Sequence, residues 1–127
     1  MCDNNKSLLS IVELGGYDNY SDLYVSKGFS VTTIHNMRKA LKIIKQDPPD
    51  VIVAEFNYQS DFRDRSSSLE SLMAALDWSP HTKVIVLYDK EWQEKLDQLL
   101  SVYSVYICFP FPINNHEFSK TLDSLIN

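Results

Sequence analysis

Cysteine, glycine and long apolar runs are scarce in this sequence, and their scarcity excludes several classes of protein. The 127 residues include two cysteines and three glycines. Cys2 lies in a polar terminus and Cys108 in an apolar run, so we expect no structural disulfide. No apolar run approaches the roughly 20 residues that a helix needs to span a bilayer, and residues 1–7 are too polar for a signal peptide. The sequence therefore predicts a cytoplasmic protein that does not bind membranes.

The sequence also lacks the motifs of common catalytic and metal-binding chemistry. Gly15 and Gly16 follow a strand-like run, but they belong to neither a G-x-G-x-x-G nor a Walker motif, so a turn is expected there. His35, His81 and His116 lie at separate element edges, without cysteine or histidine at metal-ligand spacing. No Ser-His-Asp or Cys-His arrangement can be argued. We therefore expect no enzymatic activity, no metal and no cofactor.

Composition and charge favour one ordinary globular domain. Hydrophobic residues make up 44% of the chain and charged residues 23%, a balance typical of folded proteins. The formal net charge is −5 and the 12 basic residues are scattered along the chain, whereas a nucleic-acid-binding face needs clustered Lys and Arg. The length fits a single domain over 1–127, with 1–7 as a polar N-terminal tail. We expect no nucleic-acid partner.

Short β-type apolar runs alternate with helical stripes along the whole chain. Continuously apolar runs such as 51–54 are typical of central parallel strands, which are buried on both faces. Helix starts are marked by Asn36, by a capping box of Ser67 with Glu70, and by Asn114 with Glu117. Gly28 is placed to end the first helix. The predicted strands are 8–12, 29–34, 51–54, 84–87 and 102–109, and the helices follow them at 20–27, after 36, after 67, around 92–100 and after 114.

Strict alternation of five strands and five helices predicts an α/β three-layer sandwich around a parallel sheet. Right-handed crossovers leave few topologies, of which the flavodoxin-like (βα)5 order 2-1-3-4-5 is the leading one. In that order, a crevice lies at the carboxyl ends of the first and third strands. Glu13 and Glu55 come at the ends of these two strands, so they define the candidate site.

Four segments at the predicted strands carry a resemblance that extends over the whole chain: 11–14 (IVEL), 49–55 (PDVIVAE), 84–88 (VIVLY) and 106–111 (YICFPF). On these segments, the chain resembles the response-regulator (CheY-like) receiver domain of two-component signalling. In that family two acidic residues after the first strand hold Mg²⁺, and an Asp after the third strand accepts a phosphoryl group. The fourth strand ends in Ser or Thr, and the fifth ends in a Lys that precedes Pro.

The sequence departs from the receiver pattern at nearly every position of the phosphorylation site. Phosphoryl transfer depends on positioning and on charge stabilisation by metal and cationic groups, so together these changes imply a degenerate pseudo-receiver. The resemblance also implies a cis peptide bond at the Phe109–Pro110 step. The residues that stand at the site are Glu13 and Leu14 at the acidic pair, Glu55 at the phosphoacceptor, Tyr88 at the hydroxyl position and Phe109 at the lysine position.

Several interpretations of the two carboxylates and of the function remain open. Glu13 and Glu55 can be solvated carboxylates at strand ends or a weak cation site, and Glu55 can be a permanent mimic of phospho-aspartate. The leading function is a phosphorylation-independent interaction module in signalling. One alternative is a small-ligand sensor, which needs a deep polar pocket at the strand carboxyl ends. Another is a receiver that keeps residual phosphoacceptor activity.

Aromatic residues concentrate near the fifth strand, which points to an interface. Receivers dimerise or contact targets through the fourth helix, fifth strand and fifth helix, and the resemblance implies the same here. Aromatic-rich, charge-poor patches are also typical of interfaces. The partner is then another protein or a second copy of the chain, unless the rings only fill the space of the lost lysine and phosphate. The candidate interface residues are Trp92, Tyr103, Tyr106 and Phe111.

Overall fold

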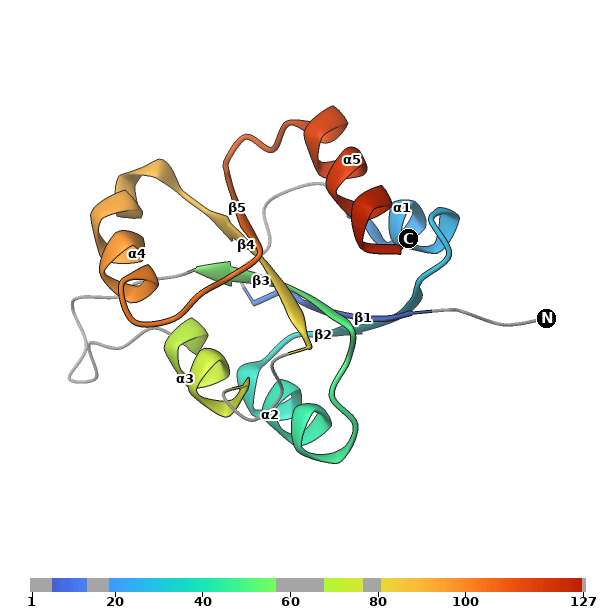
Figure 1. Ribbon diagram of the computed structural model, residues 1–127, viewed down its shortest axis with the longest axis horizontal. Coiled ribbons are helices and arrows are strands. Elements are labelled where there is room, and N and C mark those ends of the chain that lie inside the picture. Colours follow the sequence, from blue (N-terminus) through green and yellow to red (C-terminus); the bar gives the residue numbers. More distant parts are fainter. Residues whose placement is uncertain (1–5, 14–18, 57–67, 77–80, 127) are drawn as a thin grey trace.

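Five parallel strands form one twisted sheet in a computed structural model that describes residues 6–13, 19–56, 68–76 and 81–126. The strand order is β2-β1-β3-β4-β5 (Figure 1), and all four pairings are parallel. This confirms the predicted α/β, flavodoxin-like architecture. The strands are β1 (Ser7–Ile11), β2 (Ser30–Ile34), β3 (Val51–Phe56), β4 (Lys83–Tyr88) and β5 (Ile107–Pro110).

Five α-helices connect or follow the strands, and three of their ends have the expected cap. The Asn36 side chain accepts a hydrogen bond from the Lys39 N–H at 2.9 Å, and Asn114 accepts one from the Glu117 N–H at 3.0 Å. Gly28 has a φ of +100°, which favours glycine at this helix end. Ser67 of the predicted capping box lies outside the described residues. The helices are α1 (Ser21–Ser26), α2 (Met37–Gln46), α3 (Ser68–Ala75), α4 (Gln93–Leu100) and α5 (Asn115–Ile126), with a 3-10 turn η2 (Lys90–Trp92) before α4.

Two apolar clusters, one on each face of the sheet, make up the core. The first joins the sheet to α2, α3 and α4, and the second joins it to α1 and α5 (Figure 1). β3 contributes to both: Ile52 and Ala54 belong to the first cluster, and Val51 and Val53 to the second. This two-sided burial explains why β3 is continuously apolar. Within the described segments, no helix is long and apolar enough to cross a membrane.

The fifth strand begins later than predicted. The β-prone residues from Val102 onward suggested a strand, but 101–103 instead form a turn that closes α4. The Val102 and Tyr103 N–H groups both donate to the Leu99 carbonyl at 3.0 Å. The ladder to β4 starts with the Tyr106 N–H, which donates to the Val84 carbonyl at 2.8 Å. Hydrogen bonding at the helix end therefore outweighs the β propensity of these residues.

The predicted cis bond at Phe109–Pro110 is wrong, because the cis bond is at Phe111–Pro112. Pro110 is still part of β5 and stands opposite Tyr88 in the ladder. The Phe111 N–H then donates to the Tyr88 carbonyl at 2.9 Å. The chain thus stays extended beside β4 through Pro110, so β5 ends one residue later than predicted.

The polar tail also ends earlier than predicted, because Ser7 is already part of β1. Ser7 stands opposite Ser30 of β2, and its N–H donates to the Asp50 carboxylate at 2.9 Å. In return, the Asp50 N–H donates to the Ser7 hydroxyl at 3.0 Å. These bonds satisfy the polar groups at the start of β1, so a serine is accommodated at the beginning of an otherwise apolar strand.

Candidate functional site

Glu55 lies near the carboxyl end of β3, but its side chain is not solvated. β3 continues through Phe56, so Glu55 lies inside the ladder, opposite Leu87 of β4. Its exposed fraction is 2%. An unpaired buried carboxylate is costly, and no buried side-chain oxygen or nitrogen among the described residues lacks a hydrogen-bond partner. The interpretation of Glu55 as a solvated carboxylate is therefore wrong, since it is an internal polar group of the sheet.

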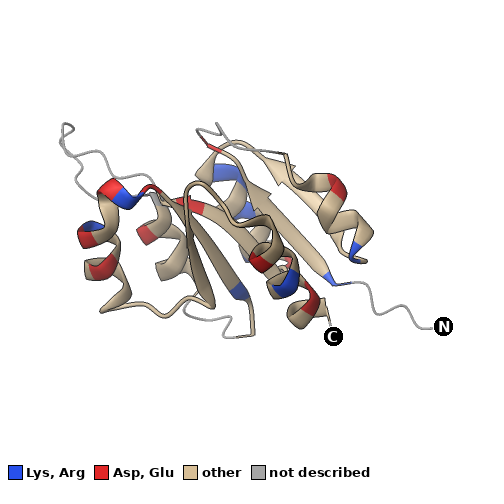
Figure 2. Ribbon diagram, turned by 90° about the horizontal axis from the view of Figure 1, so that it is seen from above, with Lys and Arg blue, Asp and Glu red and all other residues tan. Residues whose placement is uncertain are grey.

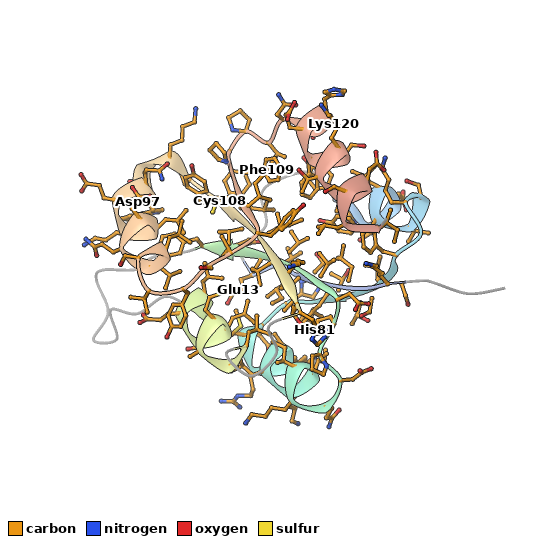
Figure 3. All side chains as sticks on the ribbon, viewed as in Figure 1. Glu13, His81, Asp97, Cys108, Phe109 and Lys120 are labelled. Atoms are coloured by element: carbon orange, nitrogen blue, oxygen red, sulfur yellow. The ribbon has the colours of Figure 1, made fainter. Side chains whose placement is uncertain are left out.

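Glu13 supplies the second carboxylate of this end of the sheet. It follows β1 directly and is half-buried (Figure 3). Val12, between it and the strand, still donates its N–H to the Ile34 carbonyl at 2.9 Å, so the backbone that leads to Glu13 is held by β2. Leu14, which stands at the second acidic position, lies outside the described residues.

Tyr88, at the hydroxyl position, connects the end of β4 to α4. Its ring is buried, with 7% exposed, and its hydroxyl donates to the Gln93 Oε1 at 2.7 Å. The Gln93 amide then donates to the Asp97 carboxylate at 3.0 Å. Burial raises the pKa of the Tyr88 phenol, the nearby Cys108 and Asp97 raise it further, and the Gln93 hydrogen bond opposes the shift. The phenol is thus neutral near pH 7 and bonded to α4.

Phe109, at the lysine position, is part of the core on the α1–α5 face. Its side chain, labelled in Figure 3, is buried, with 6% exposed. Its ring meets Phe118 edge-to-face, with centroids 5.4 Å apart and planes at 88°. Phe111, at the next X–Pro step, is half-buried against the same cluster. Both prolines are therefore preceded by phenylalanine, so neither step carries the lysine of the receiver pattern.

The described candidate residues at this end of the sheet are two carboxylates, a phenol and a phenyl ring. The described part offers the carboxylates Glu13 and Glu55, a phenol bonded to α4, and a buried aromatic ring. Mg²⁺ needs several oxygen ligands in near-octahedral geometry, and no three His, Cys, Asp or Glu residues in the described segments form a group that could hold a metal ion. Phosphoryl transfer also needs cationic or donor groups around the transferred oxygens.

The candidate interface residues lie on both sides of β5. Trp92 and Tyr103 are half-buried against the cluster under α4, and Phe111 packs against the cluster under α5. Tyr106 is the exposed one, with an exposed fraction of 44%, and its hydroxyl lies 3.0 Å from the Ser124 Oγ of α5. Three of the four rings therefore fill space beside the core, and Tyr106 is the exposed aromatic on this face.

A hollow of about 420 Å³ opens at the opposite end of the sheet, near the amino ends of β1, β3 and β4. Its lining includes Lys6, Asp50, Lys83 and Tyr106. The ligand-sensor alternative requires a polar pocket at the carboxyl ends of the strands, so this hollow is at the wrong end for it.

Cys108 is a feature that the sequence pattern did not single out. It is half-buried near Tyr88 and Asp97, and burial, assisted by the Asp97 charge, raises its pKa to about 11 (Figure 3). Thiolate is the reactive form, so at pH 8 only about one thiol in a thousand is ionised, against roughly a quarter for an ordinary cysteine. We expect iodoacetamide to modify Cys108 at least ~100-fold more slowly than free cysteine at pH 8, with the rate rising about tenfold per pH unit up to pH 10.

Intact-mass kinetics on a Cys2→Ser variant measure this rate without interference from the second thiol. Modification of Cys108 at the rate of free cysteine at pH 8 would contradict the prediction.

Comparisons with protein-family models and with curated proteins find no match for the chain. Solved structures do match. A response regulator receiver domain protein from Clostridium thermocellum superposes with a TM-score of 0.73 at 18% identity, over 96% of this chain and 94% of that one. The chemotaxis response regulator CheY4 of Vibrio cholerae gives 0.72 at 20% identity, over 95% and 98%. A two-component transcriptional regulator AraC from Clostridium phytofermentans gives 0.70 at 16%, over 96% and 93%. The chain therefore has the fold of response-regulator receiver domains.

Proposed function

We propose that this chain is a pseudo-receiver that regulates signalling through protein contacts and does not depend on phosphorylation. The observation that carries the proposal is the state of Tyr88. Where a receiver has a small hydroxyl that can meet a phosphoryl oxygen, this chain has a buried ring whose hydroxyl donates to Gln93 at 2.7 Å. The position that would read a phosphate is thus occupied by a fixed link between β4 and α4.

The remaining positions support the same function. Glu55 is buried in the β3–β4 ladder, and an extra methylene relative to Asp displaces a carboxylate by an amount that can cost about 10²-fold in rate. The receiver lysine is replaced by a phenylalanine that packs on Phe118. What this fold retains for signalling is its surface, so the proposed activity is the binding of a protein, with no enzymatic step and no cofactor.

The face formed by α4, β5 and α5 is the proposed contact surface. Val102 and Tyr106 are both exposed here, at 72% and 44%, and they lie in and after the turn that leads from α4 to β5. Figure 2 shows acidic and basic residues on α4 and α5, which fits an apolar centre with a polar rim. The partner is another signalling protein or a second copy of this chain.

Tyr106→Glu should weaken self-association or partner binding by at least about tenfold, because a carboxylate at the centre of an interface must be desolvated. The domain should stay folded, since Tyr106 is largely at the surface. Sedimentation of the wild type and of the variant measures the association, and thermal melts of both test the fold.

Val25→Glu is the matched control, because it places the same charge at another exposed apolar residue, on α1, where 60% of the side chain is accessible. It should leave association unchanged. If the wild type is monomeric and captures the same partners as Tyr106→Glu, the aromatic residues of this face are filler and the contact surface lies elsewhere.

A further inference from the structure

β2 is an edge strand, and the backbone N–H and C=O groups of its first and last residues point toward β1. The Ser30 N–H donates to the Lys6 carbonyl at 2.9 Å, and the Ile34 carbonyl accepts from the Val12 N–H at 2.9 Å. In a strand, successive residues direct their N–H and C=O groups to opposite sides. Every second residue of β2, starting from Ser30, is therefore committed to β1.

The two intervening residues, Val31 and Thr33, direct their N–H and C=O groups away from the sheet. Among the described residues, no strand pairs with β2 on this outer side, and no backbone hydrogen bond outside the regular ladders involves Val31 or Thr33. The edge thus presents two donors and two acceptors in the spacing of a strand, which is the pattern that an added extended chain can satisfy.

The sequence of β2 itself also lacks the residues that prevent strand addition. Natural edge strands are protected by charges, proline, bulges or very short length. β2 has the sequence SVTTI, with none of these residues, and its five residues pair with β1 in continuous register. The other edge strand, β5, has four residues and ends in Pro110. One edge of the sheet is therefore short and ends in a proline, while the other has no strand paired to it among the described residues.

The charge of α2, the helix nearest this edge in its layer, indicates which kind of added strand the edge of β2 would bind. α2 contacts β1 and α3, so it is the outermost helix of its layer on the β2 side. Whereas α4 and α5 carry both signs of charge (Figure 2), α2 contains no acidic residue and has four exposed cations. These are Arg38, Lys39, Lys42 and Lys45. α1, on the other face of the sheet, carries only the acidic Asp22.

A second copy of the chain does not match this charge distribution. Antiparallel pairing of two β2 strands around a two-fold axis would place the two α2 helices side by side on one face of the joined sheet. Their like charges would then repel. An extended segment with acidic residues on the α2 side, and neutral β-prone residues on the α1 side, would instead be complementary.

We propose that the open edge of β2 binds an extended, acidic segment of a partner protein as a sixth strand. Val31 and Thr33 supply the backbone hydrogen bonds, and the α2 cations select the charge. This surface lies at the opposite edge of the sheet from the α4–β5–α5 face, so the two proposals can fail independently.

The test uses two capped peptides, Glu-Val-Glu-Val-Glu-Val-Glu and its counterpart with Lys in place of Glu, titrated into the isotope-labelled wild-type chain. We expect the acidic peptide to shift the amide resonances of Val31 and Thr33 and to slow their hydrogen exchange. The basic peptide should bind at least about tenfold more weakly. Equal binding of both peptides, changes confined to other residues, or no binding at millimolar concentration would each overturn the proposal.

Two variants of Val31 separate the backbone contribution from the side chain. Val31→Pro removes an outward N–H without removing a bond to β1, and proline is tolerated at such edge positions. Val31→Pro should weaken binding of the acidic peptide at least about tenfold. Val31→Ala keeps the N–H, so this variant should bind the peptide like the wild type. Equal binding by both variants would overturn the proposal. So would protection of Val31 and Thr33 through self-association without peptide, because a second copy would then occupy the edge.

Discussion

Incubation of the protein with acetyl phosphate and Mg²⁺ should leave its intact mass unchanged. Leu14 removes one metal ligand of the receiver pattern, and the described part of the site provides no lysine at either Phe-Pro step. Tyr88 directs its hydroxyl to Gln93 rather than to a bound phosphoryl group. Because charge stabilisation and positioning carry almost all of the catalysis in phosphoryl transfer, the combined losses should abolish the reaction.

A receiver domain with the complete residue set, treated in parallel, is the positive control and should gain one phosphoryl group. A stoichiometric gain of one phosphoryl group by this chain, removed by Glu55→Ala, would show that Glu55 still accepts phosphate. The residual phosphoacceptor function would then replace the proposed one.

The fold could be predicted because local signals and burial agree along most of the chain. The continuous apolar run at 51–54 requires a strand that is covered on both faces, and Asn36, Gly28 and Asn114 mark helix ends through hydrogen bonds and backbone conformation that depend on few neighbours. The start of β5 was predicted wrongly for the opposite reason. Residues 102–105 have strong β propensity, but the Leu99 carbonyl accepts two hydrogen bonds that close α4 there.

The candidate site could be predicted only in part, because sequence position does not give burial or register. The sequence placed Glu55 just after the third strand, whereas pairing with β4 extends β3 through Glu55 and Phe56 and so makes Glu55 part of the ladder. Two Phe-Pro steps follow each other, and only the ladder between Pro110 and Tyr88 shows which of them ends the sheet. Four of the 12 basic residues already lie together in the sequence at 38–45, and the structure places all four on α2.

Phe118→Ala should produce the largest loss of stability among the substitutions considered, lowering the free energy of unfolding by about 3–5 kcal/mol. The Phe118 side chain is fully buried. Its ring lies 4.8 Å from Tyr20, 6.0 Å from Tyr24 and 5.4 Å from Phe109, measured between centroids. It therefore joins α5 to α1 and to β5, and its loss leaves a cavity beneath the helix that completes the α4–β5–α5 face.

Urea denaturation monitored by circular dichroism measures this loss. Domains of this size are stable by only about 5–15 kcal/mol, so a loss of about 3–5 kcal/mol is a large share of the total and should clearly lower the urea midpoint. Phe118→Leu, which fills most of the space, should cost less than about 1.5 kcal/mol, and Lys120→Ala, on the exposed side of α5, should change stability by less than about 0.5 kcal/mol. A loss for Phe118→Ala no larger than that for Phe118→Leu would mean that α5 is held mainly by other contacts, such as the 2.8 Å ion pair between Lys27 and Asp123.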